Sequence, residues 1–245
     1  MLETLITACC VLGAIYAVWT SLFTSGSGSG GEPAAEIPDI TSHVLKIRVV
    51  VYGSCSRDPD DEPNSRSVAS RRQCQILLEP EIPRDATTKA SKEAWIQEYI
   101  KTVSRDFKHN RNWRCEFCNE RARMSRLHKS LSWKHNFMSI SVHLVCDIDA
   151  PECGQILRSI EADWARQNNV RPAPFVRPPM APGYDFPMFA SCAECHDENP
   201  KSLRRLKKCV ACGLTRYCSV QCQKADRERH KVVCKSVSEV KWVWN

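Results

Sequence analysis

The segment that decides how this chain folds runs from Cys192 to Cys234 and reads CAECHDENPKSLRRLKKCVACGLTRYCSVQCQKADRERHKVVC. It contains two C-x-x-C pairs, two further cysteines four residues apart, and a final His-x-x-x-Cys pair. The side chains in these pairs are Cys192, Cys195, Cys209, Cys212, Cys218, Cys222, His230 and Cys234. Eight ligands of this kind make two complete tetrahedral zinc sites. Because so short a segment cannot bury a sufficient core, bound zinc would supply most of its folding free energy, on the order of 10 kcal/mol per site.

The spacing also predicts how the ligands are held. The pairs Cys218/Cys222 and His230/Cys234 each have four-residue spacing, which places both members on one face of a helical turn. The two C-x-x-C pairs would form the tight turns that supply the other halves of the sites. Spacing alone leaves the pairing open, since the first four cysteines could equally bind one ion among themselves.

Residues 192–234 resemble a MYND-type zinc finger. The resemblance is carried by Tyr217-Cys218-Ser219, by Cys222-Gln223-Lys224-Ala225-Asp226 and by His230-Lys231-Val232-Val233-Cys234. It implies interleaved ligation, in which Cys192, Cys195, Cys218 and Cys222 bind the first zinc ion and Cys209, Cys212, His230 and Cys234 bind the second. It also implies a protein–protein interaction module, and some such modules bind short proline-rich peptides.

The finger departs from the family pattern at one position that bears on its partner. Members often carry tryptophan directly after the aspartate of the helix, whereas this chain has Arg227 there, with Gln221 and Gln223 as polar contacts nearby. Residues 191–245 hold twelve Lys and Arg against six Asp and Glu, which would suit a nucleic-acid-associated regulatory protein. The same cations would neutralise thiolate sites, and we find no aromatic stacking platform. We therefore expect a protein partner, and consider nucleic acid the weaker alternative.

A third metal site is predicted in the middle of the chain. Cys115 and Cys118 form a C-x-x-C pair, followed by His143, Cys146 and Cys153. We expect the four cysteines to be the ligands, with His143 as a substitute, because His143 and Cys146 would point to opposite faces of a regular strand. Both could bind one ion only if the strand ended at Val145. Burial as small hydrophobic side chains and a redox pair are the alternatives. The W-x-C-x-x-C arrangement ahead of the finger also resembles fungal MYND-containing proteins of unassigned activity.

The fold class predicted for residues 42–168 is α+β with a mostly antiparallel sheet. Alternating apolar residues predict strands over Val44–Tyr52 and Phe137–Cys146, and a shorter strand over Cys74–Leu78. Helical spacing predicts a helix capped by Ser91 and another over Gly154–Gln167, while Gly53–Arg72 is expected to be a loop. Residues 169–190 are rich in proline and are expected to be a linker, and residues 235–245 a C-terminal tail.

The N-terminal region predicts a membrane anchor over residues 1–24. Leu5 to Phe23 is nineteen residues without a charge, and a helix of that length would span about 29 Å. A cleaved signal peptide and a buried helix are alternatives, but no positive residue precedes the apolar run and no A-x-A site follows it. Residues 25–41 would form a flexible linker. Zinc thiolates must stay reduced, so we expect the finger on the cytosolic side, with cytoplasm or nucleus as the alternative.

Length, composition and the absence of catalytic motifs restrict the possible functions of the chain further. The chain has 245 residues, a net charge of +7 and 42% hydrophobic residues, which suits one or two small folded domains. Some MYND proteins are lysine methyltransferases, but their SET domain needs far more chain, and no Asn-His-Ser-Cys segment, G-x-S-x-G or H-E-x-x-H occurs here. Eight ligands close both finger sites, so zinc is predicted to be structural. We expect a membrane-tethered zinc-binding adaptor and no enzyme, the alternative being an unrecognised activity in residues 42–168.

Overall fold

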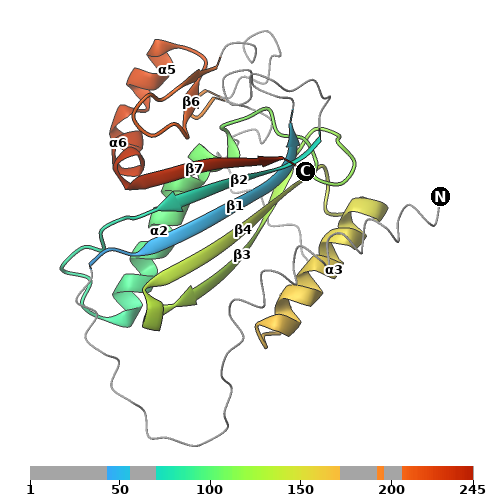
Figure 1. Cartoon of the computed structure of the whole chain (residues 1–245), viewed down its shortest axis with the longest axis horizontal. Helices are drawn as coiled ribbons and strands as arrows, with labels where there is room; N and C mark the ends of the chain where they lie inside the picture. Colours follow the sequence, from blue (N-terminus) through green and yellow to red (C-terminus); the bar gives the residue numbers. More distant parts are fainter. Residues whose placement is uncertain (1–42, 56–69, 172–191, 196–205, 245) are drawn as a thin grey trace, which may run out of the picture. The chain divides into compact units, whose positions relative to one another are not determined.

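A computed structural model describes residues 43–55, 70–171, 192–195 and 206–244 of the chain (Figure 1). A five-stranded sheet has the order β3-β4-β1-β2-β7. Its strands are β1 (Lys46–Cys55), β2 (Ser70–Leu78), β3 (Met124–Ser132), β4 (Phe137–Val145) and β7 (Val237–Trp244). All neighbouring strands are antiparallel except β1 and β4, which are parallel. The predicted class of mixed helix and mostly antiparallel sheet is confirmed.

One face of the sheet is apolar and packs against the long helix α2 (Lys89–Lys108). Alternate residues of the β1 segment are fully buried there, as the alternation in the sequence predicts. They share one core with the apolar stripe of α2; the members from these two segments are Leu45, Ile47, Val49, Val51, Ile96, Tyr99, Ile100, Val103 and Phe107. Burial of this continuous stripe is the main apolar contribution to the stability of the domain.

The other face of the sheet is polar. Tyr52 of β1 lies opposite His143 of β4, and their rings stack at 4.8 Å. His128 of β3 is on the same face, and its ring contacts Trp164 of helix α3 (Pro151–Gln167) at 5.4 Å. Since α3 contacts this face and α2 packs on the apolar one, the two helices lie on opposite sides of the sheet.

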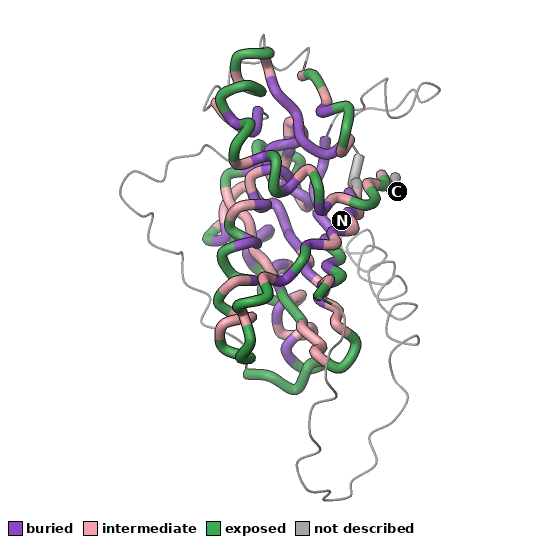
Figure 2. The backbone as a smooth tube through the Cα atoms, turned by 90° about the vertical axis from the view of Figure 1, so that its left-hand side faces the viewer, coloured by how far each residue is buried: buried purple, intermediate pink, exposed green. Residues whose placement is uncertain are grey.

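The cysteine-rich finger is built into the same core as the sheet. Its described elements are β5 (Lys207–Lys208), β6 (Arg216–Tyr217), α5 (Val220–Ala225) and α6 (Arg227–Ser236). Leu214 and Val233 of the finger are buried in the core that α2 and the sheet share. Figure 2 shows buried residues both in the body of the domain and in the finger. The finger is therefore packed against the sheet domain through shared apolar contacts.

The C-terminal segment differs most from the sequence prediction. Residues 235–245 were expected to be a tail, but Val237–Trp244 forms β7 and pairs with β2 along the sheet edge. The residues from Glu239 to Trp242 do alternate between charged and apolar side chains, a strand signal that the prediction of a tail overlooked. Helix α6 leads directly into β7, and the backbone N–H of Glu79 donates to the Ser236 carbonyl at 2.7 Å across that junction. The finger is thus an insertion before the last strand.

Three smaller expectations also need correction. Helix α2 begins after Thr88, because the hydroxyl of Thr88 accepts from the Ser91 N–H while the Ser91 hydroxyl accepts from the Thr88 N–H. Ser91 is therefore the third residue of a capping box and not the cap. Strand β3 was not predicted, since its sequence mixes polar and apolar residues on both faces. The expected loop over Gly53–Arg72 is shorter, because β1 continues to Cys55 and β2 begins at Ser70.

Trp113 fixes the segment that carries the middle cysteines onto the sheet. Its indole is fully buried and stacks on Trp242 of β7 at 5.6 Å. Gly53 of β1 makes this possible, because a Cβ at that position would lie 2.7 Å from the Trp113 ring. The backbone of Arg114 then pairs with Ser54 in both directions, at 2.6 and 3.0 Å. The cysteines that follow are thereby held at the end of β1.

Several predicted segments lie outside the described residues. These are the membrane anchor over 1–24, the linker over 25–41 and most of the proline-rich linker over 169–190. In the part of the chain that the structure describes, no helix combines the length and apolar character needed to cross a bilayer.

The buried histidine on the polar face predicts a pH dependence of stability. Burial, with His143 and Arg126 nearby, lowers the pKa of His128 to about 4. The unfolded chain, with an ordinary histidine pKa, binds more protons between that value and neutrality, so stability falls as the pH falls through this window. Relative to His128→Gln, the native chain should lose about 1–2 kcal/mol more of unfolding free energy between pH 7 and pH 5.

Urea unfolding of both proteins at the two pH values measures this difference. The zinc sites are common to the two proteins, so their own pH dependence cancels. Equal losses in the native chain and in His128→Gln would contradict the prediction.

Candidate metal centres

The first group of ligands in the finger joins the loop at Cys192 to helix α5. The Sγ atoms of Cys192, Cys195, Cys218 and Cys222 all lie within 4.8 Å of one another. Cys218 is 3.5 Å from both Cys195 and Cys222. A zinc ion with Zn–S bonds of about 2.3 Å would set tetrahedral ligands about 3.8 Å apart, so this group fits one ion. Ser219 caps α5 by accepting from the Cys222 N–H at 3.1 Å, which fixes the position of that ligand.

The second group joins the knuckle at Cys209 to helix α6. The ligand atoms of Cys209, Cys212, His230 and Cys234 also lie within 4.8 Å of one another. Nε2 of His230 is 3.3 Å from the Cys209 Sγ and 3.8 Å from the Cys212 Sγ. Gly213 closes the knuckle in a left-handed conformation with φ of 69°, and its N–H donates to the Cys209 carbonyl at 2.9 Å. The structure therefore gathers the eight predicted ligands in the interleaved arrangement that the family resemblance implies.

In each group the electrostatics favour the thiolate, the species that binds zinc, at one cysteine, while burial and the neighbouring thiols raise the pKa of Cys218 in the first group and of Cys234 in the second. Burial opposes ionisation of Cys192, but backbone hydrogen bonds within its own turn and from Cys218 lower its pKa below the ordinary value. Burial likewise opposes ionisation of Cys212, but His230 and backbone groups of the knuckle lower its pKa to about 6. The clusters therefore fit zinc in geometry, and one thiol of each is held toward the thiolate form.

Asp106 of α2 links the second group to the sheet domain. The carboxylate is fully buried and lies 3.3 Å from Nδ1 of His230, on the ring side opposite the cysteines. It also accepts from the Thr215 hydroxyl at 2.7 Å and from the Arg229 guanidinium at 2.5 Å. Burial alone would raise the pKa of Asp106, but hydrogen bonds from His230, Arg229 and Thr215 hold it below its ordinary value. A carboxylate in this position orients a metal-binding histidine and fixes its tautomer.

Arg229 completes this buried network. Its guanidinium binds Asp106 of α2 and Asp226 of the finger, both at 2.5 Å, and donates to the Thr102 carbonyl at 2.9 Å. Asp106, Asp226 and His230 also lie close enough together to hold a cation. Because Arg229 already contacts both carboxylates, this acidic group is an ion-pair network and not a further metal site.

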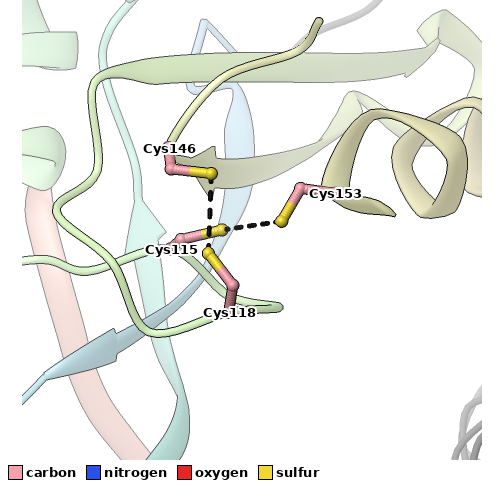
Figure 3. Close-up of side chains that lie close together, drawn as sticks. All are labelled: Cys115, Cys118, Cys146 and Cys153. Atoms are coloured by element: carbon pink, nitrogen blue, oxygen red, sulfur yellow. Dashed lines mark hydrogen bonds between the residues drawn. The ribbon is translucent and has the colours of Figure 1, made fainter. Parts of the chain in front are cut away.

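The four middle cysteines are brought together, and His143 is not among them. Cys115, Cys118, Cys146 and Cys153 form a third group whose Sγ atoms lie within 4.8 Å of one another (Figure 3). His143 instead places Nδ1 at 2.8 Å from the Glu116 carboxylate on the polar face of the sheet. Because β4 ends at Val145, Cys146 lies beyond the strand, and His143 is kept from the cysteines by its contact with Glu116.

Asp106, Thr215 and Arg229 were not predicted from the sequence. Asp106 did carry a signal, because it falls on the buried stripe of α2, seven residues after Tyr99 and three after Val103. A charged residue at such a position needs a buried partner. Nothing in the sequence identified that partner, since Arg229 lies more than a hundred residues away.

Comparisons with known proteins support the assignment of the zinc finger and find no similarity outside the finger region. The sequence model of the MYND finger family matches residues 192–234. SET domain-containing protein 14 of Caenorhabditis elegans is 53% identical over 36 residues, which cover 15% of this chain and 8% of that protein. SET domain and MYND-type zinc finger protein 6 of Schizosaccharomyces pombe is 41% identical over 51 residues, or 21% of this chain and 10% of that protein. No solved structure gives a significant match.

Residues 192–234 are therefore a MYND zinc finger, a protein–protein interaction module. The chain spans a tenth or less of the length of these two relatives, and both alignments lie in the finger region. The word SET in their names consequently says nothing about residues 43–171 of this chain.

Removing the charge of Asp106 should loosen the finger and its second zinc site together. Asp106→Asn leaves Arg229 with one buried carboxylate and should lower the unfolding free energy by about 3 kcal/mol. Loss of the carboxylate behind His230 should weaken zinc retention at that site about 10- to 100-fold. Urea unfolding and competition with a chromophoric chelator measure the two effects.

Glu98→Gln on the same helix is the matched control. Glu98 is 70% exposed and pairs with Lys101 at 2.9 Å, so its loss should change stability by less than about 0.5 kcal/mol. If Asp106→Asn behaves like Glu98→Gln in both assays, the coupling of the finger to α2 through Asp106 is wrong.

Proposed function

We propose that this chain is an adaptor whose MYND finger binds a partner protein while the α+β domain holds the finger in a fixed orientation. The observation that carries the proposal is the distribution of exposed apolar side chains. Val170, Val210, Val220 and Val232 are the exposed large hydrophobic residues of the described part of the chain, and the last three belong to the finger. Val210, at 99% exposed, stands at the tip of the second knuckle. Apolar side chains on a small, metal-stabilised module are typical of a contact surface.

The charge of the finger indicates the chemistry of the partner. The exposed ridge of α6 carries Arg227, Lys231 and Lys235 at four-residue intervals, while His230 and Val233 of the same helix are buried. A partner segment with acidic residues would complement this ridge. We propose a short peptide with a proline–apolar–proline core flanked by Asp or Glu, in which the acidic flank contacts Arg227, where family members often have tryptophan.

A peptide library tests the partner proposal. Labelled peptides with a proline–apolar–proline core, flanked by acidic or by basic residues, are titrated against the full chain by fluorescence anisotropy. Acidic flanks should bind better. Val232→Asp and Arg227→Glu should each weaken that binding about tenfold, by adding a repelling charge to the contact surface.

Val170→Asp is the matched control, because Val170 is 45% exposed, close to the 46% of Val220, but lies outside the finger. It should leave peptide affinity unchanged. Absence of binding across the library, or equal weakening by Val170→Asp, would overturn the proposal. Displacement of the peptides by duplex DNA or RNA at physiological salt would favour the nucleic-acid alternative.

We propose further that residues 1–24 tether this adaptor to a membrane with the finger on the cytosolic side. The support is the uncharged run from Leu5 to Phe23, whose nineteen residues match the apolar thickness of a bilayer. A requirement for reduced thiolates supports the cytosolic orientation.

Membrane extraction with alkaline carbonate tests the tether. The full chain should remain in the membrane pellet, and a chain beginning at residue 25 should move to the supernatant. Ala14→Arg in the middle of the run should also release the chain, since an arginine there costs about 3 kcal/mol. Ala34→Arg, outside the run, is the control and should stay in the pellet. Recovery of the full chain in the supernatant would leave cytoplasm or nucleus as the location.

A further inference from the structure

We propose that Cys115, Cys118, Cys146 and Cys153 bind a third zinc ion, in a closed four-thiolate site inside the α+β domain. This site lies outside the MYND finger and is independent of the partner proposed for it. Binding replaces the thiol protons, which pass to solvent, and changes no oxidation state.

The separations between the sulfur atoms are those of a tetrahedral ion. Figure 3 shows the four thiols pointing toward one centre from three segments of the chain. Sγ of Cys115 lies 3.8 Å from that of Cys153, and Sγ of Cys118 lies 3.5 Å from that of Cys146. Zn–S bonds of about 2.3 Å require separations of about 3.8 Å. The four Sγ atoms all lie within 4.8 Å of one another, a limit that the two groups of the finger also meet.

The turn at Cys115 has the backbone of the metal-binding knuckle at Cys209. Asn119 follows the second cysteine in a left-handed conformation with φ of 63°, as Gly213 does with 69°. The N–H of Asn119 donates to the Cys115 carbonyl at 3.2 Å, and the N–H of Gly213 donates to the Cys209 carbonyl at 2.9 Å. The N–H of the first cysteine also donates to a carbonyl just beyond the left-handed residue in both turns. Cys115 donates to Glu120 at 2.6 Å, and Cys209 donates to Thr215 at 2.8 Å. Two segments of unlike sequence thus form the same ligand-presenting turn.

The other two ligands come from opposite ends of one short connection. Cys146 directly follows β4, and Cys153 is the third residue of α3. Gly154 lets the first turn of α3 approach this connection, since a Cβ there would collide with the Ile148 carbonyl oxygen.

The alternatives fit less well. Disulfides need sulfur atoms about 2.05 Å apart, and the described cysteines are all free thiols. An iron–sulfur cluster inserts several atoms between its cysteines, whereas this group has room for one ion. Burial as small hydrophobic side chains does not account for Cys118, which is exposed, or for Cys146, which is partly exposed. With four cysteine ligands the site keeps no open position, which supports a structural ion and not a catalytic one.

The ion would fasten α3 to the sheet. The small apolar cluster at this end of α3 contains three of the ligands, Cys115, Cys146 and Cys153, together with Leu157 as its deepest helix residue. Farther along α3 the described contacts with the sheet include the ion pair of Glu161 with Arg126 and the ring contact of Trp164 with His128. Glu116, inside the knuckle, accepts from His143 and so connects the site to the polar face. Loss of the ion should therefore free α3 first.

Zinc stoichiometry of the full chain tests the proposal. Native mass spectrometry should show three zinc ions per chain, and Cys118→Ser should show two. Cys118→His restores a ligand that zinc accepts, at an exposed position with room for the ring, and should return the count to three. Cys74→Ala removes a buried cysteine outside all three groups and should keep three.

Hydrogen exchange shows which segment loses protection when the third zinc ion is absent. In Cys118→Ser, amides of Pro151–Gln167 should exchange faster while those of Arg227–Ser236 keep their protection, which shows that the finger remains folded. Two zinc ions in the native chain, iron in place of the third zinc, or a mass deficit from disulfides among these cysteines would each overturn the proposal. Unchanged stoichiometry in Cys118→Ser would overturn it as well.

Discussion

The arrangement of the finger on the sheet domain depends on one buried carboxylate, that of Asp106. A charge in a fully buried position is costly unless every oxygen is satisfied, and here Arg229, Thr215 and His230 supply the donors. All three donors belong to the finger, whereas Asp106 belongs to α2. The finger therefore satisfies a charge of the α+β domain, and the domain orients a ligand of the finger. Neither part is complete electrostatically without the other.

What the sequence could predict was local. Ligand spacing identified the finger because cysteine and histidine pairs at two- and three-residue gaps form turns whose geometry hardly depends on the rest of the chain. Strand β1 and helix α2 were also identifiable, since the buried residues from Leu45 to Val51 alternate and those from Ile96 to Val103 recur at helical spacing. These patterns reflect burial on one face of a single element.

What the sequence could not predict involved partners far apart in the chain. The pairing of Asp106 with Arg229 depends on how α6 is placed against α2, and no local pattern encodes that placement. Strand β7 gives the same lesson, because the alternation from Glu239 to Trp242 does not tell that the strand pairs with β2 or that Trp113 stacks on Trp242. The preference for Cys115, Cys118, Cys146 and Cys153 over His143 was based on strand parity, whereas in the structure β4 ends before Cys146 and His143 contacts Glu116.

Because α6 passes directly into β7, the sheet can be completed only after the finger has been synthesised and folded. A ribosome makes β2 early and β7 late, with the whole finger between them, so the edge of β2 stays without its partner strand until the finger segment has been made. An unpaired strand edge recruits foreign strands and starts aggregation. Without zinc the finger would not fold, and β7 would not be positioned on the edge of β2. Chains with this open edge would be bound by chaperones and degraded by proteases. The supply of zinc would in this way determine how much of the newly made protein reaches the folded state.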